Sequence, residues 1–557
     1  MLSDGIEGLA TAGHDLCVVG SGPVGLALAT DLARRGRRVL LLESGGTAAE
    51  STVQALSDAD ILDPSTHDDM GIAVSRQLGG TSNLWGARCL PFDPIDFEER
   101  DWIGASWPIG HGDMARWLPQ AVEATRSGAP VYHEAIAGLA LSDDRFDPTA
   151  LERWANRQQA QAIHAEAIAT DERLDVRTHA TLVGIDFAGN GCVEGIEIAD
   201  SRSGAKIRLP IATLVLAAGG LETTRLLLAA QRRVPMRFGG EDGPLGRYYM
   251  GHLVGEIADI QFTRPDFDKA FDFQIDAHGS YARRRIVPSA ATQRAHRLLN
   301  CALWPIVPPI ADARHGSAIL SLVYCAMRWG PIGRRLVAEK IRQMHISEPA
   351  PPLGPHLVNL LTGAPSAALF AANFLRRRYD KRTRLPGFFI HNRGRRYGLT
   401  FHSEQFPRAD SRVTLAREAD RLGMPRLAID YRFHADDAAS VVRTHDVMEE
   451  WLATTGLGRL EYRVPREARA EAVLGQVVHG THQIGLARMG SSREEGVVDA
   501  DLACFDAPNL YVASTAALPT SGQANPTLTA VALAFRLSAH LAERTAPLIR
   551  TATLASA

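Results

Sequence analysis

Apolar runs and glycine turns alternate at the start of the chain. Residues 16–19 are apolar and lead into the glycine-rich segment 20–25. Over 26–33 apolar residues recur with the spacing of one helix face, and a second apolar run follows at 39–42. The pattern predicts strand, turn, helix and strand. The same order of strand, glycine turn and helix is predicted over 212–231, and we expect its strand to lie beside the first.

The first glycine turn has the features of a dinucleotide site. Gly20, Gly22 and Gly25 have the spacing G-x-G-x-x-G between a predicted strand and a predicted helix. Glycine permits a tight turn there, and the backbone can approach a pyrophosphate at the helix N-terminus. Glu43 ends the second strand, where a carboxylate can bind ribose hydroxyls. In the second unit Ala218 is a candidate cofactor contact, with an ordinary turn between strand and helix as the alternative.

The segment 75–109 favours a flavin nucleotide over NAD. An NAD enzyme of this kind usually continues with regular strand-helix-strand units. Here a glycine-rich polar loop, "LGGTSNLWG", is followed by turns that contain aromatic residues. A loop of this composition suits close contact with a flat, polar ring system.

A polar strip, 518–530, precedes the last apolar stretch of the chain. It lies between a strand-like run at 509–514 and the residues 530–543, which predict a helix. Proline is accepted in the first turn of a helix because its missing N–H has no partner there, so Pro526 is expected inside the helix. Asn525 is expected at the N-cap.

Composition narrows the class of protein. With 557 residues the chain exceeds one usual hydrophobic core, so we expect two domains or one domain with a large insertion. The six cysteines are scattered without C-x-x-C or zinc spacing, which indicates a reducing compartment, no disulfide framework and no metal site. The first residues do not have a basic segment followed by an apolar one, so no secretory signal is predicted and the cytoplasm is the expected location.

Charge is unevenly distributed, although the formal net charge is only −3. Basic residues outnumber acidic ones over 328–396, and the rest of the chain is therefore acidic. Two apolar stretches, 317–327 and 355–374, lead into the arginine clusters and are too short, or too interrupted by Gly and Pro, to span a bilayer. They are interpreted either as amphipathic helices on an anionic membrane surface or as an insertion packed on the protein. No nucleic-acid-binding motif is present.

Four motifs in order resemble the glucose-methanol-choline (GMC) oxidoreductase family. They are "VVGSGPVG", "GGTSNLWGA", "LAAGGLETTRLLL" and the C-terminal "HQIGLARMG" with "ANPTLT". Within the family, the sequence is most similar to the branch of pyranose oxidases and bacterial glycoside oxidases. The resemblance covers about half of the chain and says least about 240–475.

The resemblance implies an α/β fold, α+β overall, with a discontinuous domain plan. A Rossmann-like FAD-binding domain is expected from 1–95, 170–250 and 475–557. An antiparallel-sheet substrate domain is expected from 96–169 and 251–474, with an arginine-rich helical insertion at about 317–384.

Strands of the substrate sheet are expected over 396–416 and 425–433, covering the flavin. Alternation along the first of them places His402 and Glu404 on one face and Ser403 and Gln405 on the other. His402 and Gln405 are candidate substrate contacts, and ordinary sheet residues are the alternative.

The resemblance also implies a catalytic pair over the flavin. Aligning "RMG" with the family pattern assigns the histidine to His482 and the asparagine to Asn525, with His479 as the alternative histidine. Oxidation of an alcohol requires removal of the hydroxyl proton as hydride leaves to flavin N5, and neutral imidazole is a suitable base. Asn525 is expected to hold the same oxygen and to stabilise developing negative charge.

The remaining cofactor candidates come from the middle and C-terminal motifs. The 79–83 loop is expected to hydrogen-bond the pyrimidine edge of the flavin or the diphosphate. Ser514 stands where the family commonly has Asp, and Thr527 is expected to face the polar edge of the flavin. Leu84 stands where covalent flavoproteins of this branch carry His, so non-covalent FAD is expected. The loop candidates are Gly79, Gly80, Thr81, Ser82 and Asn83.

These features predict an FAD-dependent oxidoreductase that oxidises a ring secondary hydroxyl of a sugar or glycoside. The electron acceptor is expected to be oxygen or a quinone, with peripheral membrane contact as one interpretation of the basic region. Two alternatives stay open: a non-redox lyase of the GMC type, and a dehydrogenase for a lipid-linked or phosphorylated sugar at the membrane surface. A catalytically silent flavoprotein is disfavoured because His482 and Asn525 are both present.

Overall fold

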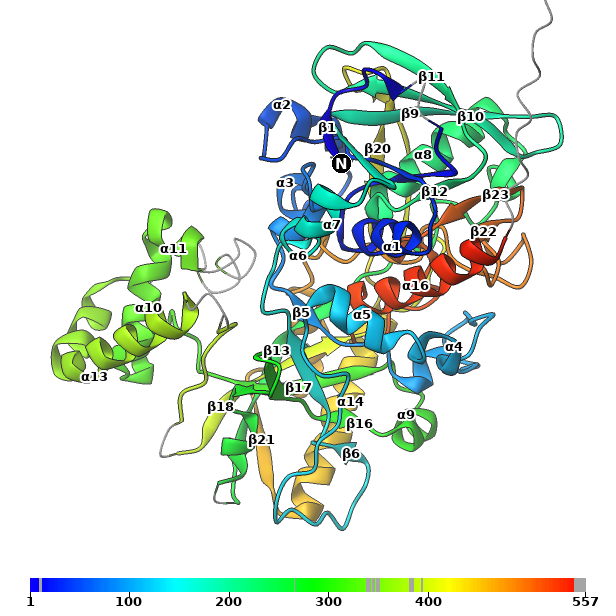
Figure 1. Cartoon of the computed structure of the whole chain (residues 1–557). Helices are drawn as coiled ribbons and strands as arrows, with labels where there is room; N and C mark the ends of the chain where they lie inside the picture. Colours follow the sequence, from blue (N-terminus) through cyan, green and yellow to red (C-terminus); the bar gives the residue numbers. More distant parts are fainter. Residues whose placement is uncertain are drawn as a thin grey trace, which may run out of the picture.

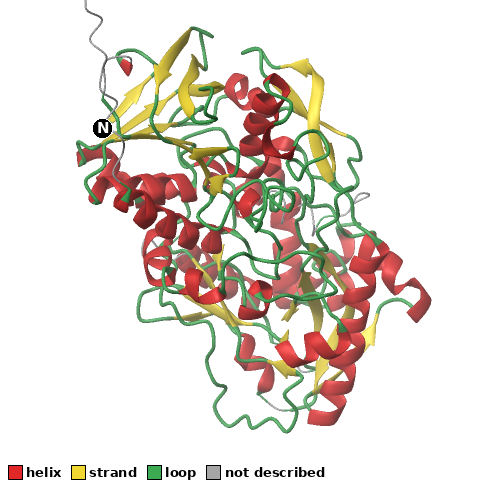
Figure 2. Ribbon diagram, turned by 90° about the vertical axis from the view of Figure 1, so that its right-hand side faces the viewer, coloured by secondary structure: helices red, strands yellow, loops and turns green. Residues whose placement is uncertain are grey.

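The computed structural model contains two sheet-based bodies and a separate group of helices (Figure 1). It describes residues 1–9, 13–264, 266–336, 342, 346, 351–379, 385–391 and 394–544. Seen from the side, strands lie at both ends of the molecule with helices and loops between them (Figure 2). The predicted mixed fold with a Rossmann-like domain is confirmed.

A seven-stranded sheet forms the core of the first body. Its order is β1-β8-β3-β2-β12-β23-β22, and its strands are parallel except at the β22–β23 edge. The central strands are apolar and buried, as parallel strands with both faces covered require. The predicted pairing of the two strand-turn-helix units is confirmed, because β12 lies directly beside β2. The strands are β1 (Leu2–Asp4), β2 (Leu16–Val19), β3 (Val39–Leu42), β8 (Leu174–Thr178), β12 (Leu214–Leu216), β22 (Ala503–Cys504) and β23 (Ala507–Val512).

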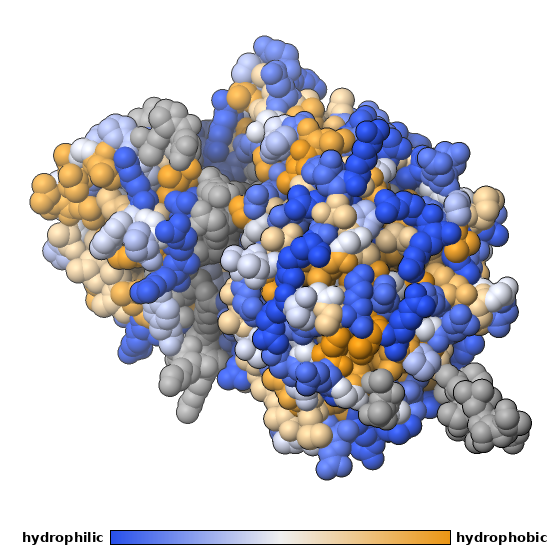
Figure 3. Space-filling model, turned by 90° about the horizontal axis from the view of Figure 1, so that it is seen from above, coloured by the Kyte–Doolittle hydropathy of each residue, from blue (hydrophilic) through white to orange (hydrophobic). Residues whose placement is uncertain are grey.

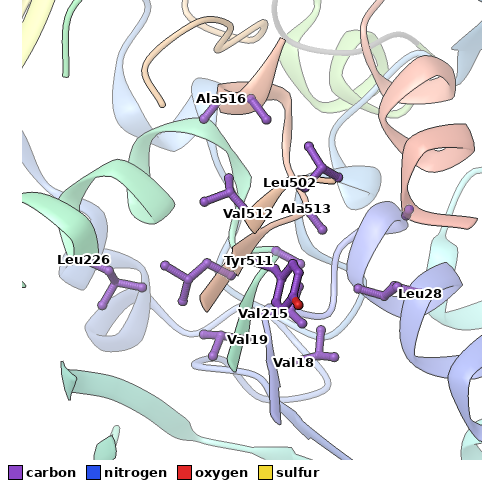
Figure 4. Close-up of a cluster of buried hydrophobic side chains, with 14 of the residues drawn as sticks. Val18, Val19, Leu28, Val215, Leu226, Leu502, Tyr511, Val512, Ala513 and Ala516 are labelled. Atoms are coloured by element: carbon purple, nitrogen blue, oxygen red, sulfur yellow. The ribbon is translucent and has the colours of Figure 1, made fainter. Parts of the chain in front are cut away.

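Helices cover both faces of this sheet. Leu28 of α1 (Pro23–Arg34) and Leu226 of α8 (Gly219–Arg233) approach Val215 and its neighbours from opposite sides (Figure 4). The C-terminal helix α16 (Thr527–Glu543) packs along α1. The last residues of the described chain thereby lie against the first nucleotide-binding unit.

Two small sheets complete the first body. One is an antiparallel meander of β9 (Ala180–Phe187), β10 (Val193–Asp200) and β11 (Lys206–Pro210). The other joins β19 (Arg412–Ala419) and β20 (Pro425–Asp430) to β4 (Ala59–Ile61). The prediction that the 412–416 and 425–433 strands extend the substrate sheet was wrong, because this hairpin packs on α8 and its apolar residues join the first core.

The second body has an antiparallel sheet in the order β17-β18-β13-β21. Its strands are β13 (Leu253–Phe262), β17 (Cys301–Ile306), β18 (Arg396–Ser403) and β21 (Gly458–Tyr462). The long helix α14 (Ala435–Thr455) packs on this sheet, and Trp451 and Phe401 lie in the shared core. A second, smaller sheet of β14 (Gln274–Ile275), β15 (Tyr281–Arg284), β7 (Leu151–Trp154) and β5 (Arg88–Cys89) lies in the same body.

Short elements connect these layers. The pair β6 (Phe146–Asp147) and β16 (Val287–Pro288) is antiparallel. The short helices are α2 (Ser51–Gln54), α3 (Met70–Ala73), α4 (His111–Ala115), α5 (Leu118–Thr125), α6 (Ala160–Ile163), α7 (Ala165–Thr170), α9 (Ala290–His296) and α15 (Arg469–Leu474).

The domain boundaries expected from the sequence stay a prediction. Two segments pack differently from that domain assignment. Apolar residues of 107–122 and of 413–431 belong to the first hydrophobic core, although both segments were assigned to the substrate domain. The hydrophobic cores therefore do not follow the domain boundaries that the motifs predict. All six cysteines are unpaired, as their spacing predicts.

The predicted helical insertion contains three described helices, α10 (Ala318–Arg328), α11 (Gly330–Leu336) and α13 (Gly354–Arg378). They form a lobe beside the second body, with α10 packed on α13 (Figure 1). The insertion leaves the sheet after β17 and returns at β18, two strands that pair with each other, Ile306 opposite Gly398. The remaining residues of 337–350 and 380–384 lie outside the described chain, except 342 and 346.

The predicted interruption of the 355–374 stretch by Gly and Pro is present as a kink. Element α13 contains 25 residues, with non-helical backbone angles at Gly363 and with Pro365 two residues later. Among the described residues, its segment 354–377 is the one helix long and apolar enough to cross a membrane by length and composition.

One buried ion pair links the two bodies. Both terminal nitrogens of Arg100 donate to the Glu404 carboxylate, at 2.8 Å each, and the Asn300 N–H donates to the same group at 3.0 Å. The two side chains are 1% and 0% exposed. A buried charge without its partner is far less stable than the pair.

Arg100→Met should therefore lower the free energy of unfolding by about 3–5 kcal/mol. The double variant Arg100→Met with Glu404→Gln should recover much of this loss, since the charge of Glu404 is removed together with that of Arg100. The exposed pair Arg408–Asp436 supplies the control, because Arg408→Met should change stability by less than about 1 kcal/mol. Denaturation midpoints measure all three variants, and equal losses for Arg100→Met and Arg408→Met would contradict the prediction.

Candidate active site

A cavity of about 1150 Å³ extends between the two bodies. Its wall contains the glycine turn after β2, the 80–88 segment, residues of β13 and β18, and the C-terminal segment around Asn525. Residues far apart in sequence thus meet at one site.

The glycine turn is shaped by close backbone packing. Gly20 has φ +101°, and a side chain there would lie 2.6 Å from the Ala217 carbonyl oxygen. A Cβ at Gly25 would lie 1.9 Å from the Gly20 carbonyl oxygen, so α1 packs directly on the turn. Gly22 is different, since its Cβ would meet nothing within 4 Å and the residue lines the cavity. Gly22 also precedes α1, which has no side-chain cap, so the N–H groups of its first turn are available to an anion.

Glu43 lies where the sequence predicts, directly after β3 and in the cavity wall. Its carboxylate accepts the Ser21 hydroxyl at 2.6 Å and the Gly45 N–H at 2.8 Å. Burial raises its pKa, while these donors oppose the shift. The same Ser21 hydroxyl accepts the Gly79 N–H at 3.1 Å and so connects the glycine turn to the 79–83 loop.

The 79–83 loop contributes mainly its backbone. Asn83 donates to the Gly80 carbonyl at 2.8 Å and accepts from Gln161, and the Ser82 hydroxyl donates to the Gly79 carbonyl at 2.5 Å. Gly79 itself does not line the cavity, which corrects its assignment as a direct contact. The other candidates that do line it are Gly80, Thr81, Ser82, Asn83, Leu84, Ala218, Ser514 and Thr527.

His482 and Asn525 lie side by side in the cavity wall. Asn525 Nδ2 is 2.9 Å from His482 Nε2, and Asn525 Oδ1 accepts from Arg88 Nε at 2.5 Å. A guanidinium has only donors, so Arg88 fixes which end of the amide carries the oxygen. Asn525 must then donate to His482 Nε2, which leaves the proton of His482 on Nδ1.

The second nitrogen of His482 continues this chain of hydrogen bonds. His482 Nδ1 is 2.8 Å from His252 Nδ1, so His482 donates and His252 accepts. Burial, assisted by the charge of Arg88, lowers the pKa of His482 to about 3. The imidazole is therefore neutral at pH 7.

The predicted N-cap at Asn525 was wrong by one residue. Helix α16 begins at Thr527 with Pro526 in the cap position and no side-chain cap. Asn525 lies before the helix, and its amide is committed to Arg88 and His482 instead.

Sequence analysis missed His252, which makes the site a cluster of histidines. The ring nitrogens of His252, His402 and His482 lie within 4.8 Å of one another, and His479 is beside His482 with ring centroids 4.6 Å apart. The rings of His252 and His402 are stacked at 4.2 Å and 27°. Because the rings of His252 and His402 are stacked, the lone pairs of their nitrogens cannot both point at one ion at the usual Zn–N distance of about 2.0–2.1 Å. The geometry therefore favours hydrogen bonding over metal ligation.

Of the two predicted substrate contacts, His402 lines the cavity and Gln405 does not. His402 Nδ1 donates to the Gln523 carbonyl at 2.7 Å. Gln405 accepts from Tyr431 and the Gly251 N–H, both at 2.9 Å, and donates to a main-chain carbonyl. The predicted alternation placed these two side chains on opposite faces, and the cavity meets the face of His402. A substrate contact by Gln405 stays a prediction.

Arg88 is a second residue that sequence analysis missed. It donates to Glu152 at 3.1 Å, and Arg283 donates to the other oxygen of the same buried carboxylate. Arg88 and Arg283 also lie over the face of Trp304, 5.0 and 5.2 Å from its centroid. Burial lowers the pKa of Arg88 to about 10, so it remains charged. Two cations share one carboxylate, which leaves net positive charge beside Asn525.

One cavity is lined by a Rossmann-type sheet and by a neutral histidine beside an oriented amide. This combination is typical of a dinucleotide-dependent oxidoreductase. Residues 407–534 match the family model described as GMC oxidoreductase, and residues 18–58 match the NAD(P)-binding Rossmann-like domain. The chain therefore contains a GMC oxidoreductase C-terminal domain, and the predicted resemblance to that family is confirmed.

Several known proteins are similar to this chain, and two of the relatives described next match nearly all of it. The 2-methyl-1,2-propanediol dehydrogenase of Mycolicibacterium austroafricanum is 25% identical, over 97% of this chain and 97% of its own. Paromamine 6'-oxidase of Streptomyces fradiae is 22% identical, over 94% and 90%. A C-glycoside 3-oxidase of Microbacterium trichothecenolyticum is 32% identical over 26% of this chain and 27% of its own. Among solved structures, pyridoxine 4-oxidase from Mesorbium loti shares the fold, with TM-score 0.51, 17% identity, and coverage of 96% and 100%.

Two glycines of the turn should respond differently to the same substitution. Gly25→Ala should destabilise the first body, because its Cβ would overlap the Gly20 carbonyl. Gly22→Ala should leave the melting temperature of the cofactor-free protein unchanged but lower dinucleotide affinity at least tenfold, because its methyl group would enter the cavity. Flavin released by acid precipitation, together with thermal denaturation, measures both variants. Full flavin content in Gly22→Ala would contradict the placement of the dinucleotide beside Gly22.

Proposed function

We propose that this enzyme is an FAD-dependent oxidoreductase that oxidises a ring secondary hydroxyl of a sugar or glycoside. The observation that carries the proposal is the contact between Asn525 Nδ2 and His482 Nε2 in the cavity that the glycine turn also lines. The electron acceptor in this proposal is oxygen or a quinone.

The residues of the cavity fit FAD. Gly22 leaves open space beside the uncapped N-terminus of α1, where a pyrophosphate is favourable, and Glu43 lies nearby for ribose hydroxyls. The 80–83 backbone and the start of α16 supply further polar groups to the same wall. Leu84 has no nucleophilic atom, so the cofactor would be held without a covalent bond. When bound, FAD supplies the acceptor for the hydride.

The hydrogen-bond chain supports a position for the reacting hydroxyl between Asn525 and His482. An alcohol oxygen that separates Asn525 from His482 would accept from Nδ2 and donate its proton to Nε2. His252 Nδ1 accepts from His482 Nδ1 and would stabilise the imidazolium that forms. Arg88 holds the amide in orientation and adds positive charge where the oxygen becomes negative.

The cavity wall supports a ring-shaped substrate. Trp85, Trp154 and Trp304 line it, and their flat apolar faces suit the C–H faces of a sugar ring. The names of the glycoside and paromamine oxidases agree with this class of substrate, and the diol dehydrogenase extends it to smaller alcohols.

A phosphorylated or lipid-linked sugar is the second candidate substrate. Arg334 and Arg335 of α11 line the same cavity as His482. Their charge favours an anionic substituent near the opening. A GMC-type lyase reaction is the non-redox alternative, and the absence of anaerobic flavin bleaching by sugars, glycosides, cyclitols and sugar phosphates would favour it.

His482→Ala should keep FAD but slow anaerobic flavin reduction about 10²–10⁴-fold, because the general base is lost. His479→Ala is the matched control, since His479 is adjacent but outside the hydrogen-bond chain to Asn525, and its reduction rate should change much less. Stopped-flow mixing with the best substrate of a sugar and glycoside screen measures both rates. Normal reduction in His482→Ala with slow reduction in His479→Ala would reassign the base to His479.

The rate of flavin reduction should be nearly independent of pH between 5 and 8. Burial places the pKa of His482 at about 3, below the ordinary value of 6.5, and the neutral form that accepts a proton predominates above the pKa. Rapid-mixing measurements across this range test the sign and size of the effect. An acid limb near 6.5 in the wild-type enzyme would show that His482 is solvated in the working state.

A further inference from the structure

The outer face of α13 is an apolar stripe on which none of the described residues packs. Residues spaced by three or four positions share this face, and all are exposed. Leu361 is 83% exposed, and only 6% of the most apolar window of the helix is buried. The stripe comprises Leu357, Leu361, Ala364, Ala368, Ala372 and Leu375, with Val358 and Leu369 beside it. Exposed apolar surface of this extent marks an interaction site.

The inner face of α13 is already used. His356 bonds Ser321 of α10 at 3.1 Å, Asn359 donates to the same hydroxyl, and Ala367 is buried. The polar positions Thr362, Ser366 and Asn373 follow the edge of the stripe. The helix therefore presents one packed face, one apolar exposed face and a polar border.

Charge around the stripe is predominantly positive. The segments 317–338 and 349–379 contain no Asp or Glu. Arg328, Arg334, Arg335, Arg376 and Arg377 are all exposed. The side chain of Arg378, the third residue of that cluster, lies outside the described structure. Each such arginine contributes about 1 kcal/mol of attraction to an anionic lipid surface.

Aromatic residues mark the ends of the same helices. Trp329 follows α10 and is 64% exposed, and Tyr379 follows α13 and is 59% exposed. Trp and Tyr have an apolar ring with a polar edge, which suits the boundary between lipid headgroups and acyl chains.

The helices favour lying on a bilayer over crossing it. The packed neighbour α10 has 11 residues, about half of the ~20 that a membrane-spanning helix needs. An amphipathic helix with an apolar face and surrounding arginines instead lies in the interfacial plane. In Figure 3 hydrophobic side chains gather on the outer side of the lobe, away from the main body.

We propose that the lobe of α10, α11 and α13 docks on an anionic lipid bilayer through the α13 stripe. Arg334, Arg335 and Phe388 at the base of the lobe line the cavity that contains His482. Docking would bring the cavity opening to the membrane interface, where a substrate or electron acceptor dissolved in lipid can enter. This surface is independent of the proposed chemistry, since binding to lipid requires no turnover.

The test uses flavin-loaded enzyme and sedimentation with vesicles of phosphatidylcholine alone or with phosphatidylserine. Wild-type enzyme should bind the anionic vesicles at least tenfold more tightly, and binding should weaken in high salt as the charges are screened within about 3 Å at 1 M. Equal sedimentation with both kinds of vesicle, or with none, would overturn the proposal.

Variants separate the stripe from a general loss of structure. Leu361→Glu with Leu369→Glu should reduce binding at least tenfold, whereas Thr362→Glu adds the same charge at the polar border and should retain more binding. Arg376→Gln with Arg377→Gln should reduce binding and its salt dependence. Flavin content and reduction by a soluble substrate should stay unchanged in all of these variants.

Two results would assign the surface differently. A dimer in size-exclusion chromatography that Leu361→Glu with Leu369→Glu converts to a monomer, without vesicle binding, would identify a second copy of the chain as the occupant. Loss of soluble-substrate turnover in the arginine variant would place those arginines in the support of the active site.

Discussion

The hydrogen bond from Arg88 Nε to Asn525 Oδ1 orders the active site. Because Arg88 can only donate, it fixes the amide of Asn525, the amide fixes the proton of His482, and His482 fixes the donor and acceptor nitrogens of His252. The partners come from β5, the strip before α16, a C-terminal loop and the start of β13. The geometry of this candidate site is thus the product of tertiary packing between both bodies.

A buried carboxylate makes this arrangement sustainable. Glu152 is fully buried and accepts from Arg88 and Arg283, so both guanidinium groups are paired with one buried carboxylate. The low local polarity lowers the pKa of the imidazoles and of Arg88, but the two kinds of side chain end in different protonation states. It holds the imidazoles neutral and ready for a proton, while the arginines, with far higher ordinary pKa values, stay charged. A neutral acceptor and a permanent cation can therefore lie within one hydrogen-bond chain.

Local patterns predicted the nucleotide-binding half well. The glycine turn and the two strand-turn-helix units depend on neighbours in sequence, and β12 does lie beside β2. His482 and Asn525 came from aligned motifs, and their contact agrees with that alignment although their roles stay a proposal. Arg88 and His252 were not predicted, because neither stands in a motif and only long-range packing brings them to Asn525 and His482. Alternation placed His402 and Gln405 on opposite faces but could not say which face meets the cavity, and the structure places His402 there.

The family match also bears on one difference between the predicted domain plan and the observed packing. It begins at residue 407, just before the β19–β20 hairpin, and that hairpin packs on α8 of the nucleotide-binding body. The preceding segment 251–406, which holds the lobe and most of the second sheet, lies outside both matched regions. The region matched by the GMC model thus begins just after the end of β18.

The position of the lobe between β17 and β18 has an evolutionary consequence. Ile306 and Gly398 are direct partners on adjacent antiparallel strands, so the chain leaves and re-enters the sheet at one place. Loops that begin and end at paired strands can lengthen, shorten or be exchanged with little effect on the register beneath them. Attachment to a surface can therefore be gained or lost in one lineage as a modular trait, while the inherited redox machinery below it remains the same.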